Sequence, residues 1–158
     1  MTKAEAPQYR WKQQGIISLW RYTECSRSYS GWHLSADAVG CASLLELLQT
    51  LAVSPESAYR TVHVTPPSLS NLKVPNFKSA KWTAPIKWRI SFESNEEATN
   101  LWSIAPQEDS VYFTLGSARM QELVRGVTAI SRGDGDYSIG GSESQSRLWF
   151  WWWLEDIA

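Results

Sequence analysis

RLWFWWWLEDIA, residues 147–158, contains seven consecutive apolar residues, and four of them are tryptophan. Successive side chains of a strand point to opposite faces of a sheet. We therefore expect Leu148, Phe150, Trp152 and Leu154 on one face and Trp149, Trp151 and Trp153 on the other. Both faces are apolar, so each needs a cover, either from this chain or from a partner. A transmembrane helix needs about 20 apolar residues, so we expect no membrane association.

Length, charge and cysteine content limit the class of protein. A chain of 158 residues has the size of one domain with a real core, and we expect a single domain over residues 1–158. It carries 15 Lys and Arg against 16 Asp and Glu, so no overall field attracts nucleic acid or an anionic membrane. The first residues contain no apolar stretch of signal-peptide length. With Cys25 and Cys41 expected to be reduced, these features favour a cytoplasmic protein.

Hydrophobic periodicity predicts an α+β fold. Alternation predicts strands within residues 15–25, 28–35, 59–65, 86–93 and 110–116, and a C-terminal β-hairpin that includes the tryptophan-rich strand. Spacings of three and four predict helices over 36–52, capped by Ser35 or Asp37, and over 117–133. Ser94 and Glu97 match a capping box and predict a short helix over 94–102. The expected domain has two layers: an antiparallel or mixed sheet of about seven strands, with two or three helices on one face.

Two segments fall outside this pattern. Residues 1–13 are expected to form a disordered tail. Residues 66–85 contain four prolines and no clean period, and we interpret them as a proline-rich surface arm, because long irregular connections in small domains are often functional. This arm and a partner molecule are the two alternative covers for the second face of the tryptophan-rich strand.

No motif for catalysis, a metal or a nucleotide stands out, and we expect no cofactor and no metal. His33 and His63 have no carboxylate or cysteine at metal-ligand spacing. The glycines of residues 133–140 follow a helix, which is the wrong side for cradling a phosphate. If the protein is an enzyme, the carboxylates to test are Asp134, Asp136 and Glu143, in the turn over residues 134–143.

Charge is segregated along the chain. Residues 66–92 carry five basic residues and no acid, with Phe77, Trp82 and Trp88 among them, whereas residues 93–109 carry five acids and no base. Basic residues alternating with aromatics are typical of single-stranded nucleic-acid surfaces. We do not expect a nucleic-acid partner here, because Trp88 is predicted to be buried and no ribonucleoprotein signature is present.

Ten tryptophans are many for this length, and tryptophan is enriched where proteins bind each other. We therefore expect a non-catalytic protein that binds another protein, and more specifically an immunity or antitoxin-like protein that neutralises a toxin domain. The candidate partner-binding residues are Trp149, Trp151, Trp153, Trp82, Glu96, Glu97, Glu108 and Asp109. A homodimer is also expected, because a second copy can cover an apolar sheet face. The alternatives are a carbohydrate or small-ligand module that uses the tryptophan face, and an enzyme with its carboxylates in the 134–143 turn.

Overall fold

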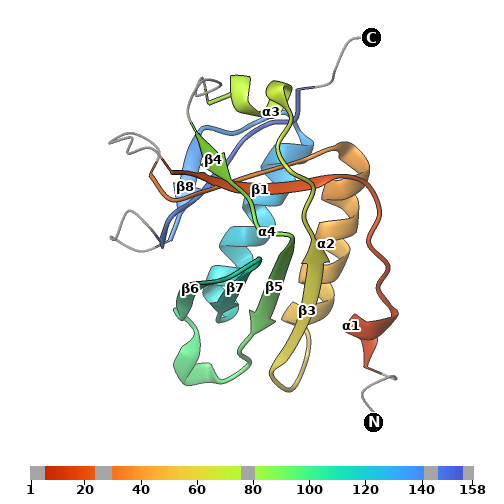
Figure 1. Cartoon of the computed structure of the whole chain (residues 1–158). Coiled ribbons are helices and arrows are strands. Elements are labelled where there is room, and N and C mark those ends of the chain that lie inside the picture. Colours follow the sequence, from red (N-terminus) through yellow and green to blue (C-terminus); the bar gives the residue numbers. More distant parts are fainter. Residues whose placement is uncertain (1–5, 24–29, 76–80, 141–145, 155–158) are drawn as a thin grey trace.

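The computed structural model describes residues 6–23, 30–75, 81–140 and 146–154. Within them the α+β class is confirmed, but the strands form two mixed sheets in place of one (Figure 1). Sheet A has the strand order β4 (Trp82–Thr83), β1 (Ile17–Tyr22), β2 (Trp32–Ala36), β9 (Leu148–Phe150) and β8 (Tyr137–Ile139). Sheet B has the order β3 (Ala58–His63), β5 (Lys87–Phe92), β7 (Ser110–Leu115) and β6 (Trp102–Gln107).

The prediction of one sheet of about seven strands is therefore wrong both in the number of strands and in the number of sheets. The described residues hold nine strands, and the two unexpected ones are β4 and β6. Strand β4 lies in the proline-rich segment, and β6 contains Pro106. Both were hidden because proline cannot donate a hydrogen bond to a sheet and so reads as a loop signal. The C-terminal hairpin is confirmed, since β8 pairs antiparallel with β9.

Two long helices, α2 (Ala38–Ala52) and α4 (Ser117–Ser131), pack side by side, and Figure 1 shows them behind sheet B. Both were predicted from their periodicity. Asp37 is the cap of α2: its Oδ1 accepts a hydrogen bond from the Gly40 N–H at 2.6 Å. The same oxygen accepts the Ile16 N–H at 3.0 Å, so one carboxylate fixes the start of the helix and the entry to β1.

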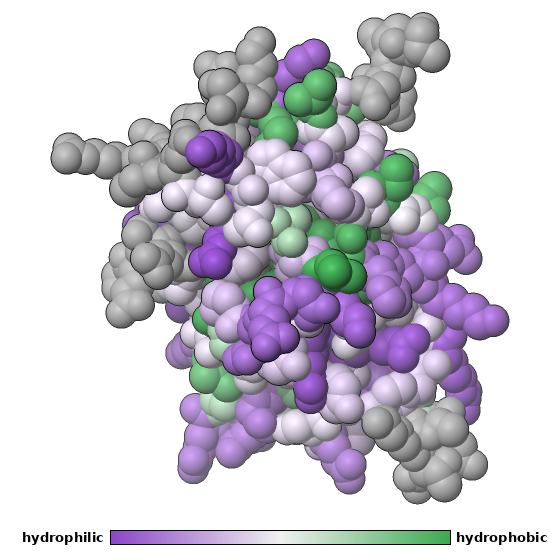
Figure 2. All heavy atoms as spheres, in the orientation of Figure 1, coloured by the Kyte–Doolittle hydropathy of each residue, from purple (hydrophilic) through white to green (hydrophobic). Residues whose placement is uncertain are grey.

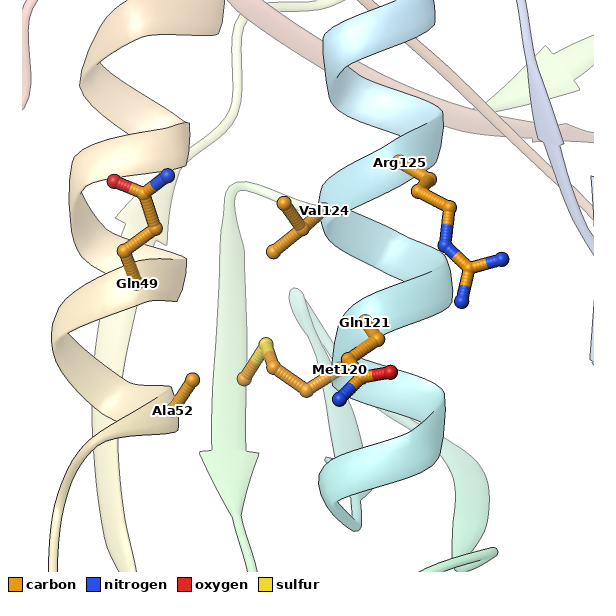
Figure 3. Close-up of a pocket in the computed structure, with 6 residues that line it drawn as sticks. All are labelled: Gln49, Ala52, Met120, Gln121, Val124 and Arg125. Carbon is orange, nitrogen blue, oxygen red and sulfur yellow. The ribbon is translucent and has the colours of Figure 1, made fainter.

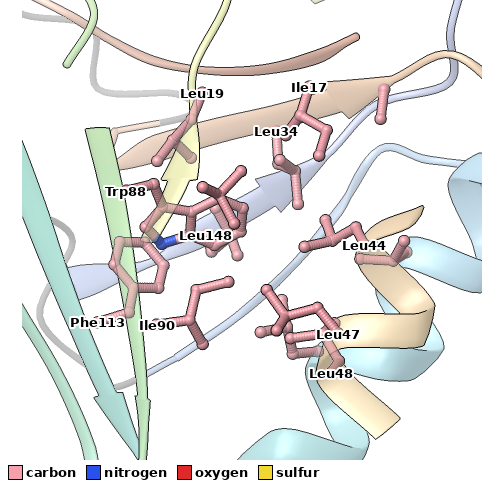
Figure 4. Packing of buried hydrophobic residues seen from close by; sticks show 14 of the residues in the cluster. Ile17, Leu19, Leu34, Leu44, Leu47, Leu48, Trp88, Ile90, Phe113 and Leu148 are labelled. Atoms are coloured by element: carbon pink, nitrogen blue, oxygen red, sulfur yellow. The ribbon is translucent and has the colours of Figure 1, made fainter. Parts of the chain in front are cut away.

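One core fills the space between sheet A, sheet B and the two long helices (Figure 4). Leu19 and Leu34 come from sheet A, Ile90 from sheet B, and Leu44 and Leu47 from α2. All five are fully buried. The predicted alternation of residues 86–93 is confirmed for Trp88, Ile90 and Phe92, whereas Ile86, expected on the same face, is exposed because it precedes the strand.

A second, smaller core lies on the other face of sheet A, where Trp20 and Trp151 are buried with Leu72. Leu72 belongs to a short helix, α3 (Leu69–Lys73), within the segment 66–85. A capping box starts this helix: Ser68 Oγ accepts the Asn71 N–H at 3.1 Å, and the Ser68 N–H donates to Asn71 Oδ1 at 2.9 Å. Of the two alternative covers for the second face of the tryptophan-rich strand, the segment 66–85 is therefore the one that the structure shows, and this part of it is packed on sheet A in place of a free surface arm.

The expected disordered tail is also corrected, for the part of it that the structure describes. Residues 7–10 form helix α1 (Pro7–Arg10), and Trp11 is buried with its indole N–H donating to the Ser43 carbonyl at 2.7 Å. The helix expected over 94–102 is reduced to one 3₁₀ turn, η2 (Glu96–Ala98). Asn95 caps this turn through its side chain, and Trp102 already begins strand β6.

Gly126, in the middle of α4, lets the helix touch sheet A. A Cβ added there would fall inside the van der Waals radius of the Phe150 ring, and that ring is fully buried. We expect Gly126→Ala to lower the free energy of unfolding, because overpacking costs about 1–3 kcal/mol and exceeds the gain of about 1 kcal/mol in helix propensity. Chemical denaturation measures this. In the double variant with Phe150→Leu the two losses should not add; full additivity would contradict the contact.

Candidate functional site

The tryptophans of residues 149–153 do not form the recognition row that their alternation predicts. Trp151 is 2% exposed, and its indole N–H donates to His33 Nδ1 at 2.9 Å, which requires that nitrogen to be unprotonated. Trp149 is half-buried, and its indole N–H donates to the Ser30 carbonyl at 3.0 Å. The indole N–H groups assigned to a partner therefore find their acceptors within the chain. The prediction of a contact surface is wrong for Trp151, because the segment that includes α3 covers it.

The expected alternation also ends early. Strand β9 stops at Phe150, and Trp152, predicted on the same face as Phe150, packs instead against the second core. Trp153 is half-buried and Leu154 is exposed. Trp82 is 37% exposed, but β4 is separated from β9 by β1 and β2, about 14 Å at the usual strand spacing. Trp82 therefore forms no common patch with Trp149.

The four acidic candidates are exposed but lie in two separate places. Glu96 and Glu97 belong to η2, next to the start of β6, and Glu108 and Asp109 form the turn at its other end. A six-residue strand spans about 20 Å. Segregation of charge along the sequence therefore does not produce one acidic surface.

The outer face of sheet B is the surface that the sequence did not reveal. Its inner face is covered by the core and the long helices, and Figure 2 shows hydrophilic residues over the lower part of the molecule, where Figure 1 places this sheet. Strand register puts three residues of each strand on the outer face. They are Tyr59, Thr61 and His63 of β3, Lys87, Arg89 and Ser91 of β5, Ser110, Tyr112 and Thr114 of β7, and Ser103, Ala105 and Gln107 of β6. None of these residues is an acid.

Arg89 stands at the centre of this face between two tyrosines. Its guanidinium carbon lies 3.6 Å from the ring centroid of Tyr59 and 5.3 Å from that of Tyr112. These are cation–π distances. Arg89 is half-buried, and Tyr112 is 38% exposed. Two rings thus hold one long cationic side chain in place on a surface whose other side chains are mostly small and polar. We call Tyr59, Arg89 and Tyr112 the Tyr–Arg–Tyr stack.

Both edges of sheet B are protected against the addition of a further strand. At β3, the side-chain amide of Gln13 imitates a neighbouring strand: it donates to the His63 carbonyl and accepts the His63 N–H, both at 2.7 Å. At β6, Pro106 removes a donor from the edge. Addition of a partner strand is therefore disfavoured at either edge.

A groove of about 340 Å³ lies between α2 and α4. Figure 3 shows Met120 and Val124 pointing across it toward α2, whereas Arg125 points away. Ligand sites combine an apolar wall with several convergent polar groups, and the charged side chain here does not converge on the groove. It therefore lacks the polar half of a ligand site.

The residues considered for catalysis and metal binding are dispersed. His33 is fully buried and His63 is exposed on sheet B. Asp134 and Asp136 are exposed, and Glu143 lies outside the described residues. In the part of the chain that the structure describes, no group of three His, Cys, Asp or Glu side chains is placed to hold a metal ion, and no helix has the length and apolar character to cross a membrane.

Comparison of the chain with models of protein families, with curated proteins and with solved structures finds no match in any of the three.

Burial of Trp151 predicts a contrast between neighbours in the terminal segment. Trp151→Ala should lower the free energy of unfolding by about 3–5 kcal/mol, the usual cost of deleting a large buried aromatic side chain. Trp153→Ala, which removes a half-buried ring outside both cores, should cost less than about 1 kcal/mol. Urea denaturation of the two variants measures both values, and equal losses would contradict this placement.

Cys41 is buried in α2, and burial, with a smaller contribution from Asp37, raises the pKa of its thiol to about 12. In Cys25→Ser protein at pH 8, alkylation of Cys41 should be about a thousand-fold slower in the native state than in urea, because the thiolate is the nucleophile. Unfolding lowers this pKa, so the free energy of unfolding should also decrease as pH rises above about 9. Mass spectrometry after timed iodoacetamide treatment measures the rates; rapid native labelling would contradict the burial.

Proposed function

We propose that this chain is a non-catalytic protein-binding module and that the outer face of sheet B is its contact surface. The observation that carries the proposal is the Tyr–Arg–Tyr stack, on a sheet face where α1 packs beside Tyr59 and Tyr112 is exposed. Tyrosine and arginine are the residues, together with tryptophan, that most often dominate binding energy at protein interfaces.

The stack also lowers the entropic cost of binding. An exposed arginine normally loses rotamer freedom when a partner immobilises it, at about 0.5–1.5 kcal/mol per side chain. Arg89 already lies against Tyr59 and within reach of Tyr112, so part of this cost has been met in folding. Preorganisation of this kind improves affinity without adding contacts.

The size of the face fits the centre of an interface. Four strands of six residues cover about 400 Å² at standard spacings, which is about half of what each partner buries in a typical stable complex. The surrounding rim would supply the rest. The acidic turn Glu108–Asp109 adjoins β7, so it belongs to this rim, whereas Glu96 and Glu97 lie at the far end of β6.

The more specific proposal is an immunity or antitoxin-like role, in which the partner is a toxin domain. It rests on the small size of the chain and on a contact face that is preformed. The homodimer expected from the sequence rested on an uncovered apolar face of the tryptophan-rich strand. Because Leu72 covers Trp20 and Trp151 there, that reason no longer holds, and the homodimer stays a prediction.

The test is affinity capture from a lysate of the native host, with the wild-type chain and an Arg89→Ala/Tyr112→Ala variant as baits. We expect a protein that the wild type retains and the variant loses, with at least about a thirtyfold weaker Kd, as expected for interface hot spots. A Gln121→Ala/Arg125→Ala variant on the groove between α2 and α4 should retain the same protein. Equal retention by both variants would contradict the proposed surface.

A further inference from the structure

The guanidinium of Arg89 contacts tyrosine rings, and it forms no ion pair with any acid that the structure describes. Tyr59 and Tyr112 lie against it. Among the described residues the only ion pair joins Arg119 to Glu122, on α4 at 3.2 Å. Register places Arg89 opposite Thr61 on β3 and opposite Tyr112 on β7, neither of which is an acid.

The other charged side chain that the strand register places on this face, Lys87, is also a cation. Lys87 precedes Arg89 by two residues and is exposed, and His63, its partner on β3, is exposed as well. Two acids flank the face: Asp109, directly before β7, accepts a hydrogen bond from the Ser110 hydroxyl at 3.1 Å, and Glu93, directly after β5, accepts one from the Ser57 hydroxyl at 2.5 Å. The face therefore presents a small basic centre surrounded by hydroxyl groups and one amide.

We propose that the Tyr–Arg–Tyr stack, with Lys87, binds carboxylates of an acidic segment of a partner protein. This inference rests on the proposed function, and it specifies the chemistry of the partner. A guanidinium stacked on a ring keeps the N–H groups of its edge available, and this edge matches a carboxylate in a two-point hydrogen bond. Lys87 adds a second cation on the same strand, one pleat away.

The same geometry disfavours single-stranded nucleic acid as the partner. Binding of that kind uses free aromatic faces on which bases stack. Here Arg89 lies 3.6 Å from the centre of the Tyr59 ring, so the guanidinium occupies the ring face that a base would need. Of the two tyrosines in the stack only Tyr112 is exposed, and a single ring gives no platform for successive bases.

The test is a titration with a ten-residue glutamate peptide with blocked ends, followed by NMR of the arginine side-chain N–H signals. We expect saturable shifts of the Arg89 signal that weaken as salt is added, because screening reduces attraction between exposed charges. Arg89→Gln should weaken binding by about tenfold or more, the usual effect of losing charge-assisted hydrogen bonds. Arg132→Gln, which makes the same change of charge at the end of α4, should bind as the wild type does.

Two tyrosine variants test the stack itself. Tyr112→Phe keeps the ring and should bind the glutamate peptide as the wild type does, whereas Tyr112→Leu should bind several-fold more weakly with the charge unchanged. Arg89→Lys keeps the charge but removes the paired N–H groups that bind a carboxylate at two points, and it should also weaken binding. Thermal melts confirm that each variant is folded, and equal binding by Arg89→Gln and Arg132→Gln would overturn the inference.

The remaining outcomes separate this inference from the proposed function. A glutamine peptide of equal length should give no shifts, and a thymidine oligonucleotide should bind more weakly than the glutamate peptide; tighter oligonucleotide binding would overturn the carboxylate assignment. If the captured partner requires Arg89 and Tyr112 but the glutamate peptide does not bind, the proposed function stands and this inference fails. If the peptide binds at Arg89 but no captured protein depends on this face, the proposed function fails.

Discussion

The structure depends on burying both faces of the central strands of sheet A. Strand β2 is buried on both sides and β9 is apolar on both sides, so a single helical layer cannot cover them. One side meets the two long helices and sheet B, and the other meets the short segment that includes α3. Burial of Trp20 and Trp151 with Leu72 places sheet A in the middle of a layered domain, and it accounts for two of the ten tryptophans.

In this arrangement the tryptophan-rich strand, which first suggested a binding site, contributes to the fold. Trp151 is held by His33 and Trp149 by the Ser30 carbonyl, so their indole groups serve the fold. The contact surface that we propose is instead the outer face of sheet B, which is polar and has Arg89 between two tyrosine rings at its centre. Gln13 and Pro106 protect the two edges of this sheet and disfavour the addition of a further strand there.

The sequence predicted the elements whose patterns are strong and local. The helices α2 and α4, the strand around Trp88 and the terminal hairpin follow from periodicity alone. The second sheet could not be predicted, because the parallel pairing of β5 with β7 depends on strand order and not on any local pattern. The stack was missed for the same reason: Tyr59, Arg89 and Tyr112 lie on three strands that only this order brings together. The roles of Gln13 and α3 were missed because they depend on contacts with residues that are distant in the sequence, namely His63 for Gln13 and the tryptophans of sheet A for α3.

The central claim is that the chain itself closes the second face of sheet A and leaves the outer face of sheet B open. Hydroxyl-radical footprinting read by mass spectrometry tests this most directly, because it reports the solvent access of each aromatic side chain. The account predicts that Trp20 and Trp151 are as protected as Trp88, which is fully buried in the main core, while Tyr112 and Trp82 are oxidised. Oxidation of Trp151 at the rate of Trp82, with Tyr112 protected, would contradict it.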